Sequence, residues 1–481
     1  MIQSNYSSHQ SLSFRVLNEA QIHEIVQAAY LILERTGARI DHEPMREMLK
    51  KAGAEIKNNR VYVPRWLTRQ CLDLAPKGIM IYDRQGRPAM HLDGYKTYYG
   101  SSTASPKNRD ALTGQVHETT LADIATGIRV ADALEHIDFV MPFGSAQDCP
   151  GPVAEAHEYL ALVRNTTKPA VFCGYSPQGT ETVLEMAAAI AGGHDELRRR
   201  PMVIPYPEPI APLYWPDDIV EKIMICARLG TPHITTGAQL LSLTAPVTIA
   251  GGLAQSTAES LFSNVMAQTA KAGTPVFLAA IVEGINARNG LISMGGPEYQ
   301  LSQAAQAEIA RHLGLPSWGC AGATDAKIID AQAGAEAAIS IFIQALAGVN
   351  LVHDVGYLDS GIQCSAAMMV LGDEIISMVK HILKGIVVDA DTLATEVIDR
   401  VGPGGNFMTQ KHTIKHLRQS LWNASLFCKE GQDSWEALGS PDAQAAADRK
   451  VKDILDKHIP QALDPKLEEE LKQIISAAEK N

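Results

Sequence analysis

Short apolar runs, each followed by an alanine-rich helical stretch, recur eight times along this chain of 481 residues. Successive runs start about 30 to 43 residues apart, which is the length of a βα unit with modest loop insertions. Several are introduced by a glycine that ends the preceding helix and a proline that cannot continue it, as in Gly273-Thr274-Pro275. The runs are Thr97–Ser101, Phe139–Phe143, Ala170–Gly174, Met202–Tyr206, His233–Thr236, Val276–Val282, Trp318–Ala323 and Leu351–Val355.

This repeat predicts an α/β fold, a closed (β/α)₈ barrel of the TIM type. The alternative is a doubly wound open sheet, which usually has a glycine-rich turn after its first strand. The turn here, Gly100-Ser101-Ser102-Thr103, does not have that pattern. We therefore expect a barrel over residues 96–385, preceded by an α+β extension over residues 1–95 and followed by a helical region over residues 386–481.

Composition and charge exclude several classes of function. Forty-two Lys and Arg against 54 Asp and Glu give a net charge of −12, which does not suit sequence-independent nucleic-acid binding. No stretch approaches the ~18 apolar residues of a membrane span, and the first residues lack the basic and apolar regions of a secretion signal. Seven dispersed cysteines indicate reduced thiols. We expect a cytoplasmic protein with no local metal-binding motif.

In a barrel of this type, functional side chains gather at the C-terminal ends of the strands. The residues predicted there are rich in aromatic rings and carboxylates, with Lys327 as the nearest cation, although aromatic residues make up only 6% of the chain. Such a mouth suits a cationic organic ligand, because cation–π attraction contributes ~0.5–2 kcal/mol per ring. The predicted substrate-binding residues are Tyr98, Tyr99, Tyr206, Glu208, Trp215, Gln239, Glu283 and Tyr357.

Each of these residues also has a structural interpretation. Tyr98 and Tyr99 could pack the first strand, with one ring directed inward and the other outward. Trp215 lies between prolines and could be a hydrophobic plug of a rigid loop. Glu208 could be merely solvated. The sequence leaves these alternatives open.

His353 and Asp325 are the predicted catalytic residues, because they follow the eighth and seventh strands. His353 could instead form a structural pair with Asp354, and Asp325 could cap the following helix. If the pair served as acid and base, the protein would be a hydrolase or lyase.

Two segments resemble a known family. The first contains Asp330-Ala-Gln-Ala-Gly, Leu351-Val-His-Asp-Val-Gly-Tyr-Leu-Asp-Ser-Gly361 and Asp373-Glu374. The second contains Gly402-Pro-Gly-Gly-Asn-Phe, His412-Thr413, Leu417-Arg418 and Trp422. Together they resemble the trimethylamine methyltransferase superfamily, and the similarity extends over about residues 15 to 440.

The resemblance implies a (β/α)₈ barrel that passes a methyl group to Co(I) of a separate corrinoid protein. Founding members carry pyrrolysine, whereas the segment Gly319–Asp330 consists of ordinary residues. The chain therefore resembles the non-pyrrolysine branch, several of whose members act on glycine betaine, proline betaine, carnitine or γ-butyrobetaine. It implies a methyltransferase of quaternary amines that is a homo-oligomer and has no tightly bound cofactor of its own.

The predicted chemistry agrees with this resemblance. A quaternary ammonium cannot hydrogen-bond, and its leaving group is a neutral tertiary amine that needs no general acid. The protein then has only to bind the substrate, orient its N–CH₃ bond and exclude water. We expect His353 to orient a substrate carboxylate through an N–H group. A non-catalytic barrel that binds a betaine remains the other alternative.

Overall fold

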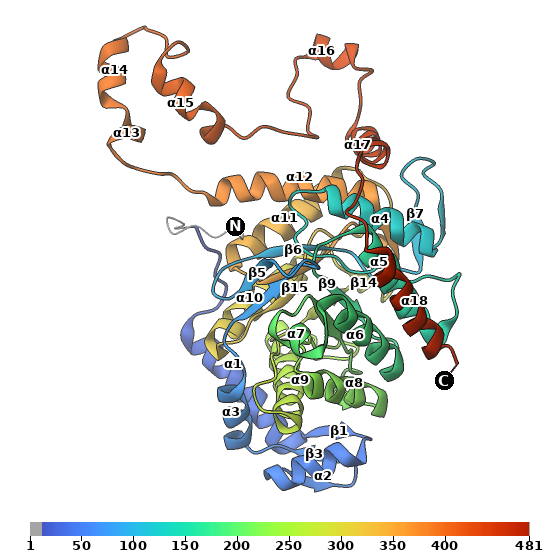
Figure 1. The fold of residues 1–481 in the computed structure, drawn as a ribbon. Coiled ribbons are helices and arrows are strands. Elements are labelled where there is room, and N and C mark those ends of the chain that lie inside the picture. The colour runs from blue at the N-terminus through green and yellow to red at the C-terminus, as the bar shows by residue number, and fades with distance from the viewer. Residues whose placement is uncertain (1–11, 481) are drawn as a thin grey trace.

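The computed structural model describes residues 12–480 (Figure 1). Within it, eight parallel strand segments pair in sequence to form a closed ring. Parallel ladders join β6 (Tyr98–Ser101) to β16 (Leu351–Val355), and β16 to β15 (Trp318–Cys320). A third ladder joins β9 (Ala170–Cys173) to β10 (Val203–Tyr206). These five strands correspond to the runs predicted as the first, eighth, seventh, third and fourth strands of the barrel.

Shorter contacts close the rest of the ring. The backbone N–H of Ile234 donates to Pro205 O at 3.0 Å, which joins the fifth strand to β10. The remaining neighbours are joined by single parallel bridges, which pair Gly100 with Phe139, Val140 with Ala170, His233 with Val276, and Leu278 with Ser317. The predicted (β/α)₈ barrel is confirmed, and all eight predicted runs take part in it.

A helix follows each strand and packs on the outside of the ring, and the short α7 (His194–Arg199) follows α6. Ser176 and Asp330 cap α6 and α11 by accepting backbone N–H bonds. Gly314 ends α10 in the left-handed conformation. The helices are α4 (Leu121–Ala133), α5 (Ala154–Asn165), α6 (Pro177–Ala191), α8 (Asp217–Leu229), α9 (Ile249–Ala270), α10 (Pro297–Leu313), α11 (Ala331–Ala347) and α12 (Ala366–Leu383).

The N-terminal extension packs on one side of the barrel. Its helices α1 and α3 contact α9, and residues 252–268 of α9 are buried. The chain therefore has a second hydrophobic core between the extension and the barrel. The extension consists of α1 (Glu19–Leu31), a π-helical turn (Ile32–Thr36), β1 (Ala38–Ile40), α2 (Glu43–Ala52), β2 (Glu55–Lys57), β3 (Arg60–Tyr62), α3 (Arg65–Leu74), and the hairpin of β4 (Ile79–Tyr82) and β5 (Pro88–Leu92).

Short strands and turns surround the C-terminal end of the barrel. They form one sheet in the order β17-β18-β7-β8 and another in the order β12-β13-β14. These segments hold the loops that follow the barrel strands. Their bounds are β7 (Lys107–Arg109), β8 (Val116–Glu118), β12 (Gln239–Leu240), β13 (Val282–Ile285), β14 (Ile292–Ser293), β17 (Tyr357–Leu358) and β18 (Gln363–Ser365), with 3₁₀ turns at Gly151–Val153 and Asp359–Gly361.

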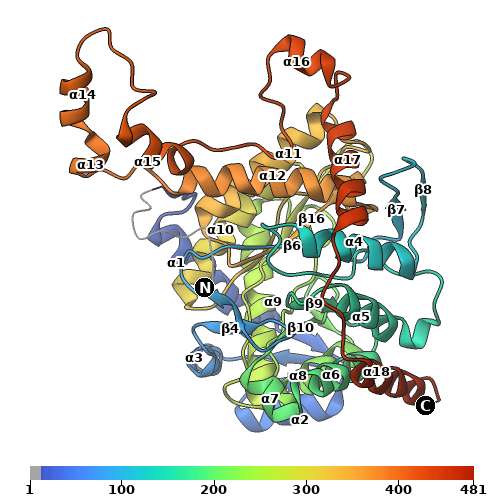
Figure 2. The same ribbon diagram turned by 45° about the horizontal axis from the view of Figure 1, so that its top comes forward.

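The C-terminal region is helical, as predicted, and it divides into two parts. Helix α17 (Ala443–Lys457) packs on α12 and α4, and α18 (Pro465–Ala478) packs on α6 and α5. Residues 386–437, which we call the arm, extend beyond the barrel in two excursions (Figures 1 and 2). Between them the arm returns to α12, where Trp422 Nε1 donates to Ser377 Oγ at 3.1 Å and Ser425 N donates to Glu374 Oε1 at 2.9 Å. The arm contains α13 (Ala390–Leu393), α14 (Thr395–Val401), α15 (Lys411–Ser420) and α16 (Gln432–Ala437).

The arm exposes several large apolar side chains, including Ile386, Met408 and Ile414. Within residues 12–480, no helix is long and apolar enough to cross a membrane.

Candidate active site

A cavity of about 200 Å³ opens at the C-terminal end of the barrel strands. Its lining combines carboxylates, aromatic rings, thiols and an imidazole with apolar groups such as Ile281 and Met294. No lysine or arginine is among the lining residues that the structure describes. The lining residues with functional groups are Thr103, Cys173, Tyr206, Glu208, Glu283, Cys320, His353, Asp354, Tyr357 and Ser360.

Three carboxyl groups from different strands converge on this cavity. Glu208 follows β10, Glu283 lies in β13 and Asp354 lies in β16. Glu283 Oε2 and Asp354 Oδ1 are buried and have no hydrogen-bond partner. Buried carboxyl oxygens without a hydrogen-bond partner are complementary to a bound cation.

Burial raises the pKa of all three acids. It raises the pKa of Glu283 to about 7, with a smaller contribution from the charge of Glu208. It raises the pKa of Asp354 well above its usual range. The surrounding protein also raises the pKa of Glu208, although the carboxylate itself is open to the cavity. A cation bound in the cavity would favour the ionised forms of these acids.

The end of β16 departs from regular strand geometry. Its register with β6 shifts between Val352 and Val355, and Asp354 has a φ of 82°. Such an irregularity lets two consecutive side chains point to the same side of a strand. Both His353 and Asp354 consequently reach the cavity. A left-handed conformation at a non-glycine residue costs about 1–3 kcal/mol, which is typical of functional sites.

His353 is held in one orientation by its neighbours. Its Nδ1–H donates to Gly319 O at 2.9 Å, and its ring stacks on Trp318 with centroids 4.1 Å apart. Burial lowers the pKa of His353 to about 4, so the ring is neutral. Nε2 then carries a lone pair, 3.1 Å from Asp354 Oδ1 and 3.8 Å from Cys320 Sγ.

This geometry confirms that His353 reaches the cavity but does not agree with its expected role. The neutral ring has a single N–H, and that N–H is already bonded to a backbone carbonyl. His353 therefore has no second N–H to give to a substrate carboxylate. It can accept a proton or a hydrogen bond at Nε2 instead.

Tyr206 and Tyr357 face the cavity, as predicted. The hydroxyl of Tyr206 donates to Glu208 Oε1 at 3.3 Å. The hydroxyl of Tyr357 donates to Thr103 O and accepts from Thr103 N at 3.2 Å. Their hydroxyls are therefore engaged, and their rings are fixed beside the acids.

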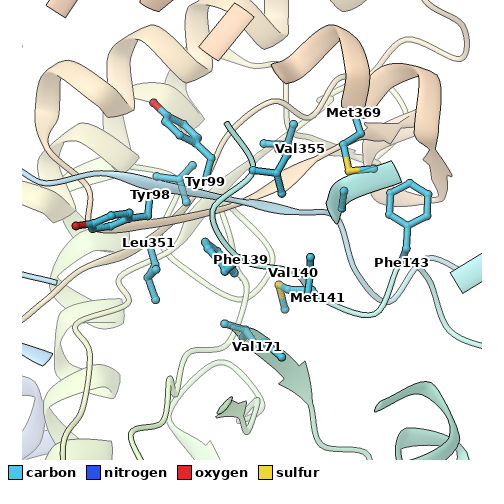
Figure 3. Packing of buried hydrophobic residues seen from close by; sticks show 14 of the residues in the cluster. Tyr98, Tyr99, Phe139, Val140, Met141, Phe143, Val171, Leu351, Val355 and Met369 are labelled. Carbon is cyan, nitrogen blue, oxygen red and sulfur yellow. The ribbon is translucent and has the colours of Figure 1, made fainter. Parts of the chain in front are cut away.

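Tyr98 and Tyr99 do not line the cavity, which corrects the prediction for both. Figure 3 shows the ring of Tyr99 directed toward the outer helices, where its hydroxyl donates to Ile341 O of α11 at 3.3 Å. Tyr98 is the first residue of β6 and so lies at the opposite end of the barrel, where its hydroxyl accepts from the backbone N–H of His91 at 3.1 Å. Both rings are packing residues, the alternative that the sequence had left open.

Trp215 and Gln239 are also placed differently from the prediction. Trp215 lies in β11 (Tyr214–Trp215), which pairs with β1 of the extension, and its ring packs on Phe262 with centroids 4.8 Å apart. Gln239 donates to Glu259 Oε2 at 2.5 Å and accepts from Ser256 Oγ at 2.7 Å. Trp215 therefore belongs to the second core, and α9 occupies both ends of the Gln239 amide.

Asp325 holds two loops together at the rim. Its carboxylate accepts from Ser293 Oγ at 2.6 Å, from Met294 N at 2.8 Å and from Ser360 Oγ at 2.8 Å. It lines an adjoining cavity and not the one described above. The structure thus places Asp325 beside the acidic cavity and outside its described lining, and its catalytic role stays a prediction. The helix cap expected from Asp325 is supplied by Asp330.

Two groups of side chains could hold a metal ion. Cys320, His353 and Asp354 each bring a ligand atom within 4.8 Å of the others, and this buried set of donors suits a transition metal. No sequence spacing indicates this group, because Cys320 and His353 lie far apart in the sequence and meet only through the pairing of β15 with β16. The second group, Asp391, His412 and His416, is in the arm, where Lys415 Nζ lies 2.6 Å from the same Asp391 carboxylate.

The whole chain resembles proteins of known activity. The sequence model of the trimethylamine methyltransferase (MTTB) family matches residues 3–481. The chain belongs to this family. It is 30% identical to trimethylamine methyltransferase MttB of Desulfitobacterium hafniense strain DCB-2 over 482 residues, covering 100% of this chain and 97% of that protein. It is 29% identical over 465 residues to the glycine betaine methyltransferase of strain Y51, covering 96% and 97%.

This MTTB-family protein also has a relative among solved structures. The monomethylamine methyltransferase MtmB of Methanosarcina barkeri aligns with a TM-score of 0.50 and 12% identity, over 92% of this chain and 96% of that one. That likeness agrees with the barrel described above. The protein is therefore a methyltransferase of the family that acts on methylated amines, and the resemblance found in its sequence is confirmed.

Proposed function

We propose that this MTTB-family protein transfers a methyl group from a quaternary ammonium compound to Co(I) of a partner corrinoid protein. The observation that carries the proposal is the charge of the cavity. Glu208, Glu283 and Asp354 line it, and no described lining residue is a lysine or arginine. A permanent cation is the ligand that such a lining stabilises.

The unpartnered carboxylate oxygens fit a ligand that cannot donate hydrogen bonds. A quaternary ammonium attracts Glu283 Oε2 and Asp354 Oδ1 by charge alone. The rings of Tyr206 and Tyr357 offer cation–π contacts beside them. Ionisation of the acids when the cation binds would release protons, because their pKa values are raised in the empty site.

The protein's contribution to methyl transfer is to bind, orient and desolvate the substrate. The partner's corrinoid supplies the nucleophile that receives the methyl group. Loss of a methyl group turns the cation into a neutral amine, so the attraction of the three carboxylates disappears with the reaction. The lining thus favours the substrate over its product without a general acid.

The test uses the purified protein, a Co(I) corrinoid protein and a panel of quaternary ammonium compounds. We expect the absorbance of the methylated corrinoid to appear with at least one compound and to require the protein. A mixture without corrinoid protein is the control. Demethylation at the same rate in that control would refute the proposal.

The proposal also includes association of the protein with further copies of itself. The arm exposes Ile386 to 89% and Met408 to 74%, and monomeric proteins rarely expose such groups of apolar side chains. We therefore retain the homo-oligomer expected from the sequence and place its contact on the arm. This association is separate from the transient one with the corrinoid protein.

A further inference from the structure

The charge of the cavity bears on which quaternary ammonium compound it accepts. Betaines carry a carboxylate as well as the ammonium group. In this cavity, that carboxylate would lie among Glu208, Glu283 and Asp354, and none of the described lining residues is a lysine or arginine. His353 offers that carboxylate no free donor at Nδ1, because its Nδ1–H is bonded to Gly319 O at 2.9 Å.

The hydroxyl groups of Tyr206, Tyr357 and Ser360 in the lining are already engaged within the protein. The hydroxyl of Tyr206 donates to Glu208, and that of Tyr357 donates to Thr103 O. The hydroxyl of Ser360 donates to Asp325 Oδ1 at 2.8 Å. A carboxylate entering the cavity would have to break one of these bonds to gain a hydroxyl donor.

The adjoining cavity contains Lys327, but this lysine is paired as well. Its Nζ lies 3.1 Å from Asp359 Oδ1 and donates to Asp325 O at 2.7 Å. It lines the space at the rim together with Asp359 and Ser360 and is not part of the acidic cavity. Lys327 is therefore already paired with an acid. The buried Lys222, whose charge acts on Glu208, is also engaged, because its Nζ donates to Gly174 O at 2.9 Å and lies 3.3 Å from Asp218 Oδ2.

From these contacts we propose that the cavity selects quaternary ammonium compounds without a carboxylate, such as choline and tetramethylammonium, over glycine betaine. The identity of the cavity as the methyl-donor site rests on the proposed function. The selection itself rests on three carboxyl groups, engaged hydroxyls and the absence of lysine or arginine from the described lining.

Choline and glycine betaine form a matched pair of probes, because they share the trimethylammonium group and differ in a hydroxymethyl against a carboxylate. Binding of each to the purified protein is measured by titration calorimetry, with tetramethylammonium as the ligand that carries only the charge. We expect choline to bind at least ~10-fold more tightly than glycine betaine, or about 1.4 kcal/mol. Equal or tighter binding of glycine betaine overturns the proposal, and so does failure of all three compounds to bind.

Glu208→Gln tests whether the acids cause the selection. Removing one carboxylate weakens the attraction for choline and relieves the repulsion of glycine betaine, so the ratio of their dissociation constants should fall at least ~10-fold. A variant whose cavity is merely disturbed weakens both ligands alike and leaves the ratio unchanged. An unchanged ratio therefore counts against the proposal.

The titrations are repeated after dialysis against a chelator, because Cys320, His353 and Asp354 could hold a metal ion that binds a carboxylate. Tight glycine betaine binding that disappears on chelation overturns the proposal by assigning the carboxylate to that metal. The result is also independent of methyl transfer. Efficient demethylation of glycine betaine refutes the selection and supports the proposed function. Selective binding of choline without any methylated corrinoid supports the selection and counts against the proposed function.

Discussion

Glu283→Gln should stabilise the empty protein and weaken its ligand binding at the same time. The pKa of Glu283 rises from 4.5 to about 7 because the carboxylate is buried near Glu208. The folded state thus holds the proton more tightly than the unfolded chain does. Stability is lost as the pH rises from 4.5 to about 7, and it stays lost above.

The size of this effect follows from the shift. Each pKa unit corresponds to about 1.4 kcal/mol, so the ionised carboxylate costs about 3 kcal/mol above pH 7. A glutamine avoids the charge but leaves a buried amide without a partner, at a cost of about 1 kcal/mol. We therefore expect Glu283→Gln to gain about 2 kcal/mol of unfolding free energy at pH 8 and none at pH 5.

Ligand binding should change in the opposite direction. Two unit charges about 5 Å apart interact by roughly 3 kcal/mol at an effective dielectric constant near 20. Because Glu208 and Asp354 remain in the variant and still attract the cation, we expect choline to bind about 10- to 100-fold more weakly and not to lose all binding. Thermal denaturation at both pH values, with and without choline, measures both effects.

Glu259→Gln is the matched control. Burial also raises the pKa of Glu259 to about 7, but this carboxylate accepts from Leu213 N, Gln239 and Gln255 and lies outside the cavity. The control should lower stability, because donors would face an amide N–H, and should leave choline binding unchanged. The reasoning is refuted if Glu283→Gln is no more stable than the parent at pH 8, or if both variants weaken binding equally.

The same structure supports three shorter predictions. Tyr206→Phe should bind choline with an affinity within about threefold of the parent, whereas Tyr206→Ala should lose ~3- to 30-fold in affinity, because the ring makes the cation–π contact. Equal losses of affinity in calorimetry would contradict this. Asp325→Asn should lower the unfolding free energy by about 1–3 kcal/mol through loss of the rim bonds, as denaturant titration can measure. Ile414→Asp in the arm should dissociate the oligomer in light scattering, while Ile459→Asp, a substitution of another exposed isoleucine outside the arm, should not.

The barrel was predictable because its signal is distributed along the chain. Eight apolar runs with regular spacing each predict one strand, and the outcome does not depend on any single run. Even the second, fifth and sixth strands, whose contacts with neighbouring strands are mostly isolated bridges or single hydrogen bonds, were found from their apolar residues. The place of the N-terminal extension was not predictable, since it depends on tertiary contacts such as the pairing of β11 with β1.

The candidate site was predictable where a residue lies at or just after the end of a strand. Tyr206, Glu208, Glu283, His353 and Tyr357 meet that condition, and all five line the cavity. The failures have a common physical cause. A sequence indicates that a ring follows or begins a strand, but packing against a helix or a second core decides where it points, as for Tyr99 and Trp215.

Asp354 shows most clearly what a strand pattern cannot reveal. In a regular strand, consecutive side chains alternate, so only one of His353 and Asp354 would face the cavity. The register shift in β16 and the φ of 82° at Asp354 bring both there. That conformation is unfavourable for aspartate, and burial without a hydrogen-bond partner for Oδ1 adds to the cost. A bound cation offsets the cost of burying the unpartnered carboxyl oxygen, but it does not offset the cost of the left-handed backbone conformation. The strain therefore holds a carboxyl group where a bound cation would favour its ionised form, in agreement with a site built to bind a cation.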